Sequence, residues 1–400
     1  MNKKFIKKLG EKLIHGLLTL SGSITSIIVL LIVIFLFKEG AGLFNRSTLG
    51  DDMVLAVNKS NPLNKIKAAK VKAIFDQQVT NWKQVGGKND SIIIIRLEDL
   101  STYYTEEQLG ANLENVGACV SKLTDSLSGA VVYVQKKFVT KDFKGKVLPE
   151  EHLSLTEFFF GKEWFPTAVP SAQFGILPLI LGTLWVSLGA ILIALPLGLG
   201  VAIYLAEIAD PRLRGVLKPV IELLSGIPSV IYGFFGLVVI VPLIQQAFNL
   251  PVGETALAGS IVLGIMALPT IITVAEDAMR TTPRAMKEAS LALGATRWQT
   301  IYRIIIPYSI SGITAGAILG IGRAIGETMA VLMVTGNAGV IPHTYLQPVR
   351  TIPATIAAEL GESAQGGIHY QALFTLGCVL FVITLLVNLG VEYVSSKRKF

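Results

Sequence analysis

Residues 288–307 read EASLALGATRWQTIYRIIIP, and this stretch decides how the rest of the chain is interpreted. Its first part has helix-forming composition, Gly294 permits a turn, and Pro307 can start the next helix. The stretch is therefore expected to form a helix-turn-helix. Because apolar segments lie on both sides of it, the unit is expected to lie on a membrane face. An amphipathic surface loop with no further role is the alternative.

The composition is that of an integral membrane protein. Of 400 residues 52% are apolar and only 16% are charged, against roughly 25% charged residues in an average soluble domain. A helix needs about 20 mostly apolar residues to cross the bilayer core. Six spans are predicted: 16–37, 174–205, 220–244, 256–275, 308–334 and 368–391. Residues 220–244 are interrupted by Glu222 and two prolines, and 308–334 contain Arg323 and Glu327.

Basic residues predict the orientation, because cytoplasmic flanks carry an excess of Lys and Arg. The clusters lie before the first span, around 212–218, within 280–303 and in the tail 397–399. Alternation of six spans places all four on one side, so both termini are expected in the cytoplasm. The net charge of +7 then reflects topology and requires no nucleic-acid partner. The first apolar stretch is longer than a signal peptide's and is expected to stay as an anchor.

The sequence offers no candidate catalytic residue, cofactor site or metal site. Its two cysteines and four histidines have no metal-ligand spacing. No phosphate-binding loop or serine nucleophile elbow occurs. The chain is therefore predicted not to be an enzyme, and any ATP it uses must be bound by another chain.

Three regions are expected. Residues 1–38 form a cytoplasmic segment and the first span, and 39–173 form an extracytoplasmic insert long enough to fold. In the insert, 91–95 and 130–134 are predicted to be buried strands, and Thr105 is predicted to start a helix with a capping box. Residues 174–400 form a compact five-helix unit whose cytoplasmic loop covers about 276–307.

The stretch 288–307 resembles the EAA motif of ATP-binding-cassette importer permeases. The matching residues are Glu288, Ala289, Gly294, Ile304 and Pro307, while Ser290 and Ile306 depart from the motif. In that family the segment is a coupling helix that docks on an ATPase subunit. The resemblance implies the MetI-like permease fold, two cytoplasmic ATPase subunits as partners, and coupling roles for the five matching residues.

Residues 174–183, 222–236 and 322–331 resemble the phosphate permease pair of bacterial importers, and the sequence after Thr328 resembles the PstC-type family. This implies transport of inorganic phosphate, a paralogous PstA-type permease and a periplasmic phosphate-binding protein. Segments 56–62, 73–87 and 128–134 resemble pieces of that binding protein. The insert departs where an anion loop would follow its strand, because Glu98 and Asp99 stand there. A docking platform, or an ordered remnant, is expected rather than independent phosphate binding.

Arg323 and Glu327 are charged residues within an apolar run. Four residues apart on one helix, they would share a face and pair, which lowers the cost of a buried charge. Arg323 would bind phosphate through a permanent charge and planar donors, and Glu327 would hold it when the path is empty. Thr328, Ser229 and Tyr232 are further candidates for the path. The alternative is an ion pair that only fixes helix register.

Glycines at 312, 316 and 320, and again at 322 and 326, recur at a four-residue spacing that lets a neighbouring helix approach closely. Plain helix packing is the favoured interpretation of that spacing.

Three other functions remain open. One Arg does not distinguish phosphate from sulfate or molybdate. An ATP-independent carrier or channel would need no coupling loop. A sensing scaffold would lose signalling, but not transport, on deletion of residues 51–150.

Overall fold

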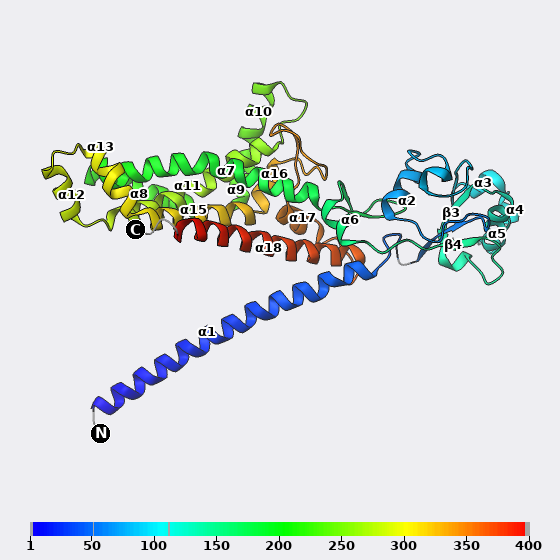
Figure 1. The fold of residues 1–400 in the computed structure, drawn as a ribbon, viewed down its shortest axis with the longest axis horizontal. Coiled ribbons are helices and arrows are strands. Elements are labelled where there is room, and N and C mark those ends of the chain that lie inside the picture. Colours follow the sequence, from blue (N-terminus) through cyan, green and yellow to red (C-terminus); the bar gives the residue numbers. More distant parts are fainter. Residues whose placement is uncertain (1–2, 51, 111–112, 397–400) are drawn as a thin grey trace.

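The computed structural model describes residues 3–50, 52–110 and 113–396. An α/β insert lies at one end of an elongated helix bundle (Figure 1). The other end carries α12 (Arg284–Ala292), α13 (Arg297–Thr300) and the C-terminal end of α18 (Ile368–Ser396). The first helix, α1 (Lys3–Ala41), extends from the insert side toward that same end. The basic tail 397–399 lies outside the described residues.

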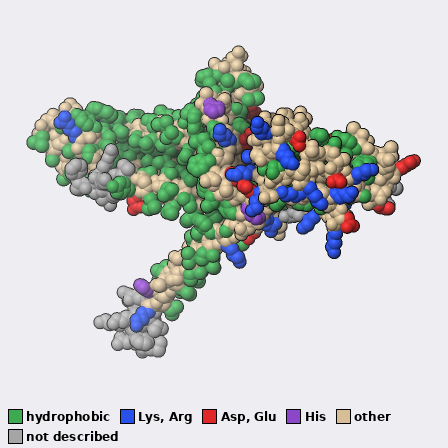
Figure 2. All heavy atoms as spheres, turned by 45° about the vertical axis from the view of Figure 1, so that its right-hand side comes forward, with side chains coloured by type: hydrophobic (Ala, Val, Ile, Leu, Met, Phe, Trp, Pro, Cys, Tyr) green, Lys and Arg blue, Asp and Glu red, His purple; other side chains and the backbone are tan. Residues whose placement is uncertain are grey.

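Among the described residues, five helices are long and apolar enough to cross a membrane. These candidate spans are Lys12–Asn45, Leu177–Ile208, Ser229–Phe248, Ala256–Arg280 and Ile368–Tyr393. A pair bent by 70°, Arg297–Tyr308 with Ile310–Gly326, brings the number to six when it counts as one span, in agreement with the sequence. Figure 2 shows apolar side chains covering the bundle and α1, and charged side chains gathered on the insert.

Two predicted span boundaries are wrong. The third span begins at Ser229 rather than at residue 220, because Gly226 and Pro228 separate it from α8 (Pro211–Ser225). The fifth ends at Gly326, where the backbone turns from helical to extended. The other elements of the bundle are α6 (Leu155–Phe160), α7 (Leu177–Ile203), η4 (Tyr204–Ile208), α9 (Ser229–Phe235), η5 (Gly236–Ile240), α10 (Val241–Phe248), α11 (Ala256–Arg280), η6 (Ile301–Ile305), α14 (Ile306–Tyr308), α15 (Ile310–Gly326), α16 (Met329–Val334) and α17 (Ile352–Glu359).

Helix α11 is the centre of the bundle and packs against α7 and α15. Its contact with α15 depends on glycine, since a Cβ at Gly312 would lie 2.2 Å from that of Ala278. Gly316 and Gly320 face Val274 and Ile271 in the same way. This confirms the packing interpretation for the first three glycines. Gly322 and Gly326 make no such contact among the described residues, since an added Cβ there meets no described atom within 4 Å, and packing at these two positions stays a prediction.

Gly312→Leu is expected to separate α15 from α11, whereas Gly322→Ala should leave this contact intact. Overpacking of this kind costs roughly 1–3 kcal/mol. The melting temperature of the purified Gly312→Leu protein should therefore fall by several degrees. It is measured as the temperature at which heating removes the monodisperse peak in size-exclusion chromatography. Equal melting temperatures for the two variants would contradict the packing.

The insert contains a four-stranded sheet in the order β2-β3-β1-β4. Its strands are β1 (Met53–Val57), β2 (Ile93–Arg96), β3 (Ala130–Gln135) and β4 (Lys146–Leu148). β2 and β3 are parallel, and β1 is antiparallel to both β3 and β4. Both predicted strands are confirmed, but β2 lies at the sheet edge and only Ile95 of it is buried. A run of four isoleucines does not distinguish an edge from a central position.

Helices cover both faces of this sheet. One apolar cluster joins the sheet to α5 (Val116–Ser126), and the other joins it to α2 (Ala68–Phe75) and Trp82. The predicted capping box at Thr105 is confirmed and begins α4 (Glu106–Leu109). The remaining elements of this region are η1 (Gly42–Asn45), η2 (Trp82–Val85), α3 (Leu100–Tyr103), η3 (Lys136–Phe138), β5 (Trp164–Phe165) and β6 (Gln173–Phe174).

A buried carboxylate, Glu150, joins the insert to the membrane-proximal segment. It accepts hydrogen bonds from Thr48 N at 2.6 Å, Leu49 N at 3.1 Å and Ser171 Oγ at 2.8 Å, and also from the hydroxyls of Ser47 and Thr48. Its side chain thereby ties the chain entering the insert to the chain leaving it.

Glu150→Gln is expected to loosen this junction, because an amide nitrogen would face donors where a carboxylate oxygen now accepts. Leaving these buried donors without acceptors costs on the order of 3 kcal/mol. Protease cleavage within 45–52 and 148–154 should become faster, while the neighbouring substitution Glu151→Gln should not change it. Unchanged protection in Glu150→Gln would show that other contacts hold the junction.

Candidate functional site

Arg323 lies in the last turn of α15 and is partly buried. The predicted pairing with Glu327 is wrong. The helix ends at Gly326, Glu327 has extended backbone with φ −71° and ψ 134°, and its Oε1 accepts a hydrogen bond from Ala330 N at 3.3 Å. Since residue 327 is outside the helix, the four-residue spacing no longer places both side chains on one face. No ion pair between described residues joins them.

The electrostatic influence of Arg323 instead extends to the hydroxyl of Tyr232. Tyr232 is buried in α9, and its hydroxyl donates to the Leu224 carbonyl at 2.8 Å. Helix α9 packs tightly on α16, because a Cβ at Gly233 would lie 2.9 Å from the Ala330 Cα atom.

The other two candidates, Ser229 and Thr328, make no hydrogen bond or ion pair with Arg323 or Tyr232 among the described residues. Ser229 is the first residue of α9, three positions before Tyr232, so both lie on the same side of that helix. Thr328 borders a largely apolar cavity of about 460 Å³. The remaining residues that line it are Gly326, Pro353, Ile356, Ala357, Leu360, Gly361 and Leu380.

The stretch 288–307 forms the predicted helix-turn-helix at one end of the bundle (Figure 1). Gly294 has φ +85°, the left-handed conformation that glycine adopts most readily. Thr296 and Gln299 then cap α13 reciprocally, with Gln299 N donating to Thr296 Oγ1 at 3.2 Å. Pro307 lies in the three-residue helix α14, and the spanning helix begins after the bend, at Ile310.

The surface of this unit, the docking loop (residues 284–307), is exposed and partly apolar. Helix α12 has no buried residue, Glu288 and Ala289 are exposed, and Leu293 is 90% exposed. Ala289 and Ile304 border a groove of about 390 Å³ together with Met286, Ser290, Leu293, Ala295, Gln299 and Arg303. Such a surface at the end of a bundle suits contact with another protein.

Comparison with known families identifies the chain from its sequence. Residues 194–400 match the family described as binding-protein-dependent transport system inner membrane component, and residues 36–146 match the PBP superfamily domain. The chain belongs to the first of these families. It is therefore a transport-system inner membrane component and not an enzyme, with a mostly α-helical fold and a small α/β insert that resembles a binding-protein domain.

The matches to relatives of this transport component cover most of the length of each relative. It is 42% identical over 247 residues to the probable ABC transporter permease protein YqgH of Bacillus subtilis, covering 62% of this chain and 80% of the relative. It is 40% identical over 249 residues to the phosphate transport system permease protein PstC of Mesorhizobium japonicum, covering 58% and 75%. A solved structure of the MetNI methionine ABC transporter is 17% identical, with a TM-score of 0.44 over 56% of this chain and 98% of that chain.

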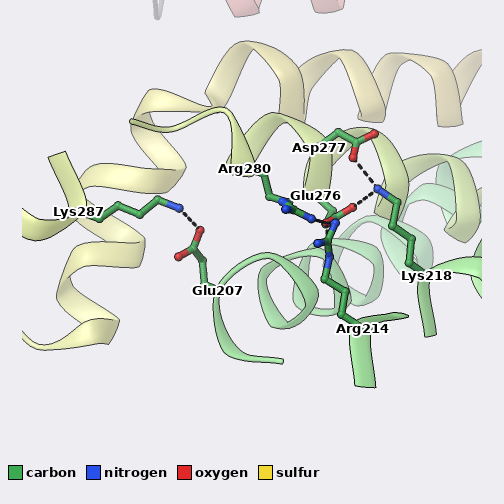
Figure 3. A network of polar contacts seen from close by, with 7 residues as sticks. All are labelled: Glu207, Arg214, Lys218, Glu276, Asp277, Arg280 and Lys287. Carbon is green, nitrogen blue, oxygen red and sulfur yellow. Dashed lines mark hydrogen bonds and ion pairs between the residues drawn. The ribbon is translucent and has the colours of Figure 1, made fainter. Parts of the chain in front are cut away.

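Sequence reasoning missed a charge network at the docking-loop end of the transport component (Figure 3). Glu276, 1% exposed on α11, pairs with Arg214 and Lys218 of α8, each at 2.7 Å, and with Arg280 at 3.5 Å. Lys218 also pairs with Asp277 at 2.7 Å, and Lys287 of α12 pairs with Glu207. The signal available in the sequence was the acidic pair just before Arg280, because an acidic residue near a basic helix end is expected to pair with a cation.

Lys218 stays charged in this network. Burial alone would lower the pKa of its ammonium group, but hydrogen bonds to Asp277 and Glu276, together with their charges, outweigh burial and raise the pKa above its usual value. The Lys218 contribution to the network is therefore fully present at neutral pH and would be lost only as the pH rises through this raised pKa.

A second missed cluster lies toward the insert end of the transport component. Glu359 of α17 is bound by Arg350 at 2.7 Å, Trp164 Nε1 at 3.0 Å and His369 Nε2 at 2.9 Å. These residues come from four separate stretches of sequence, and no local pattern joins them.

Proposed function

We propose that this chain is the PstC-type permease subunit of an ATP-driven importer that moves inorganic phosphate into the cytoplasm. The observation that carries the proposal is Arg323, which is partly buried in the last turn of α15 and is in none of the ion pairs between described residues. A permanent cation without a carboxylate partner suits a dehydrated anion. The 40% identity to a protein named as a phosphate permease supports the same substrate.

The proposed partners follow from the surfaces of the chain. Two cytoplasmic ATPase subunits would bind the docking loop and its counterpart on a paralogous PstA-type permease. That permease or membrane lipid would cover the apolar side of the bundle, where Val216, Leu223 and Phe234 are 62%, 73% and 60% exposed. A periplasmic phosphate-binding protein would deliver the substrate. Orientation in the bacterial cytoplasmic membrane would place both termini and the docking loop inside and the insert outside, at the opposite end of the bundle (Figure 1).

The insert is proposed to dock the binding protein rather than to bind phosphate itself. The Asp99 carboxylate accepts a hydrogen bond from Arg96 N at 2.8 Å, at the end of β2 where an anion loop would be needed. The Arg96 guanidinium lies over the Phe75 ring, 5.6 Å from its centroid. The Arg96 backbone N–H is therefore already bonded to the Asp99 carboxylate, whose negative charge would repel phosphate.

In the proposed cycle, ATP binding displaces the docking loops of the two permeases and switches the central path from inward to outward facing. Phosphate from the binding protein then enters the path, where Arg323 receives it, with Ser229, Tyr232 and Thr328 as further polar groups. Glu327 accepts a hydrogen bond from Ala330 N in the first turn of α16 and would thereby stabilise the break after Arg323. Hydrolysis of ATP resets the path inward. Glu288, Ala289, Gly294, Ile304 and Pro307 are proposed to couple the loop to the ATPase.

Uptake of radiolabelled phosphate into proteoliposomes tests this function. The vesicles hold the chain with its co-purified partners, with ATP in the compartment that the ATPase faces and binding protein on the other side. We expect uptake that requires ATP and resists excess sulfate or molybdate. Uptake without ATP would indicate a carrier or channel, and inhibition by either competitor would indicate another oxyanion.

A further inference from the structure

Helix α8 is held by polar contacts at both ends. None of its side chains is buried, so it is not fixed by an apolar core of its own. Arg214 and Lys218 hold its first half against Glu276, and the Leu224 carbonyl in its last turn accepts the hydrogen bond from Tyr232. Helix α8 thus connects the end of α11 to the start of the span that carries Tyr232.

The Glu276 end of this connection is rigid. Its carboxylate is 1% exposed and receives Arg214 on one oxygen and Lys218 on the other, each at 2.7 Å (Figure 3). A buried carboxylate that lost these cations would be strongly disfavoured. Any displacement of the end of α11 therefore carries α8 with it unless the ion pairs break.

The docking loop lies directly beside this anchor in the chain. Glu276 is one turn before the end of α11 at Arg280, and α12 begins only four residues later, at Arg284. Lys287 of α12 is also tied to Glu207 in η4, the continuation of α7. A force on α12 is therefore passed to the end of α11 through the short connection and to the end of α7 through the Lys287 ion pair, in addition to its contacts with α13 and η6.

We propose that Glu276 is a positioning residue that makes α8 follow the docking loop, so that motion of α12 reaches Tyr232 at the start of the third span. The proposal rests on the function proposed above. In it, α8 transmits displacement through the Glu276 ion pairs at one end and the Tyr232 hydrogen bond at the other. For this transmission, α8 must have two discrete positions, one for each state of the docking loop.

Glu276→Gln removes the charge and keeps the shape, and Lys218→Met is a milder variant that leaves Arg214 and Arg280 beside the carboxylate. Asp277→Asn is the matched control, because Asp277 is 60% exposed and touches only Lys218 among the ion pairs of the described residues. In the complete complex, we expect ATPase subunits to remain bound and ATP hydrolysis to persist in both variants. Phosphate transported per ATP should fall at least about tenfold in Glu276→Gln, less in Lys218→Met, and little in Asp277→Asn.

A distance measurement distinguishes this role from simple stabilisation. Spin labels at positions 216 and 386, both exposed, report the separation of α8 from α18, which none of these ion pairs joins to the docking loop, after Cys119 and Cys378 are replaced by Ser. Trapping the complex with ATP should change this distance in the unsubstituted protein and in Asp277→Asn, but not in Glu276→Gln. Equal changes in all three, an unchanged transport ratio, or loss of the ATPase subunits from both variants would overturn the proposal. Failure of the phosphate assay in the unsubstituted complex would instead reject the proposed substrate, because the distance change does not depend on phosphate.

Discussion

Arg323→Gln is expected to reduce ATP-driven phosphate uptake about 10- to 100-fold while the complex still assembles. Glutamine retains hydrogen-bond donors but loses the charge, and a hydrogen bond to a charged group is worth roughly 1.5–3 kcal/mol. The residue lies near the end of α15 and is not part of the α11 contact made by Gly312, Gly316 and Gly320. Removing its charge should therefore spare the fold. The measurement is initial uptake rate at saturating ATP, normalised to the amount of assembled complex.

Two further substitutions define what Arg323 contributes. Arg323→Lys keeps the charge without the planar arrangement of donors, so we expect intermediate uptake. Glu327→Gln should have a smaller effect than Arg323→Gln, because Glu327 bonds to Ala330 N and not to Arg323. Wild-type uptake by Arg323→Gln would remove Arg323 from the path. An equal loss in Glu327→Gln would show that the two residues act as a pair during transport.

Sequence reasoning succeeded where the deciding forces are local. Long apolar runs identified the spans, since crossing a bilayer is a property of one segment. The turn at Gly294 and the capping box at Thr105 are both predicted correctly from the sequence. A left-handed turn and a helix start each depend on only a few neighbouring residues. The order of strands in the insert was not accessible, because β2 and β1 both pair with β3 through contacts distant in sequence.

The candidate path shows the limit of that reasoning. Spacing alone placed Arg323 and Glu327 on one helix face, but α15 ends between them. Close packing of α16 against α9 is favoured over continuation of α15 as one helix. The packing is close because a Cβ at Gly233 would lie 2.8 Å from Met333 Sδ. The partners of Glu276 were equally inaccessible, because two of them lie about 60 residues earlier in the chain. Polar groups inside a bundle are paired by tertiary packing, which periodicity does not encode.

Gly294→Val is expected to abolish coupled transport by distorting the docking loop. The residue has φ +85°, and a β-branched side chain strongly disfavours this conformation, at a cost of about 1–3 kcal/mol. An added Cβ would meet no described atom within 4 Å, so the expected effect comes from the backbone rather than from crowding inside the chain. The turn orients α12 relative to α13, and both Glu288 and Ala289 depend on that orientation. Co-purification of the ATPase and ATP-dependent uptake should both fall at least about tenfold.

Gly294→Asn supplies the control at the same position, because asparagine enters the left-handed region far more readily than valine. If backbone conformation is the cause, Asn should retain most of the ATPase binding and uptake that Val loses. If Asn and Val fail alike, any side chain at 294 obstructs the partner, and the loop is then a tightly packed interface rather than a turn that needs glycine. Normal ATPase binding and uptake by Gly294→Val would mean that the shape of residues 284–307 does not matter for transport, and the proposed coupling role of this loop would be wrong.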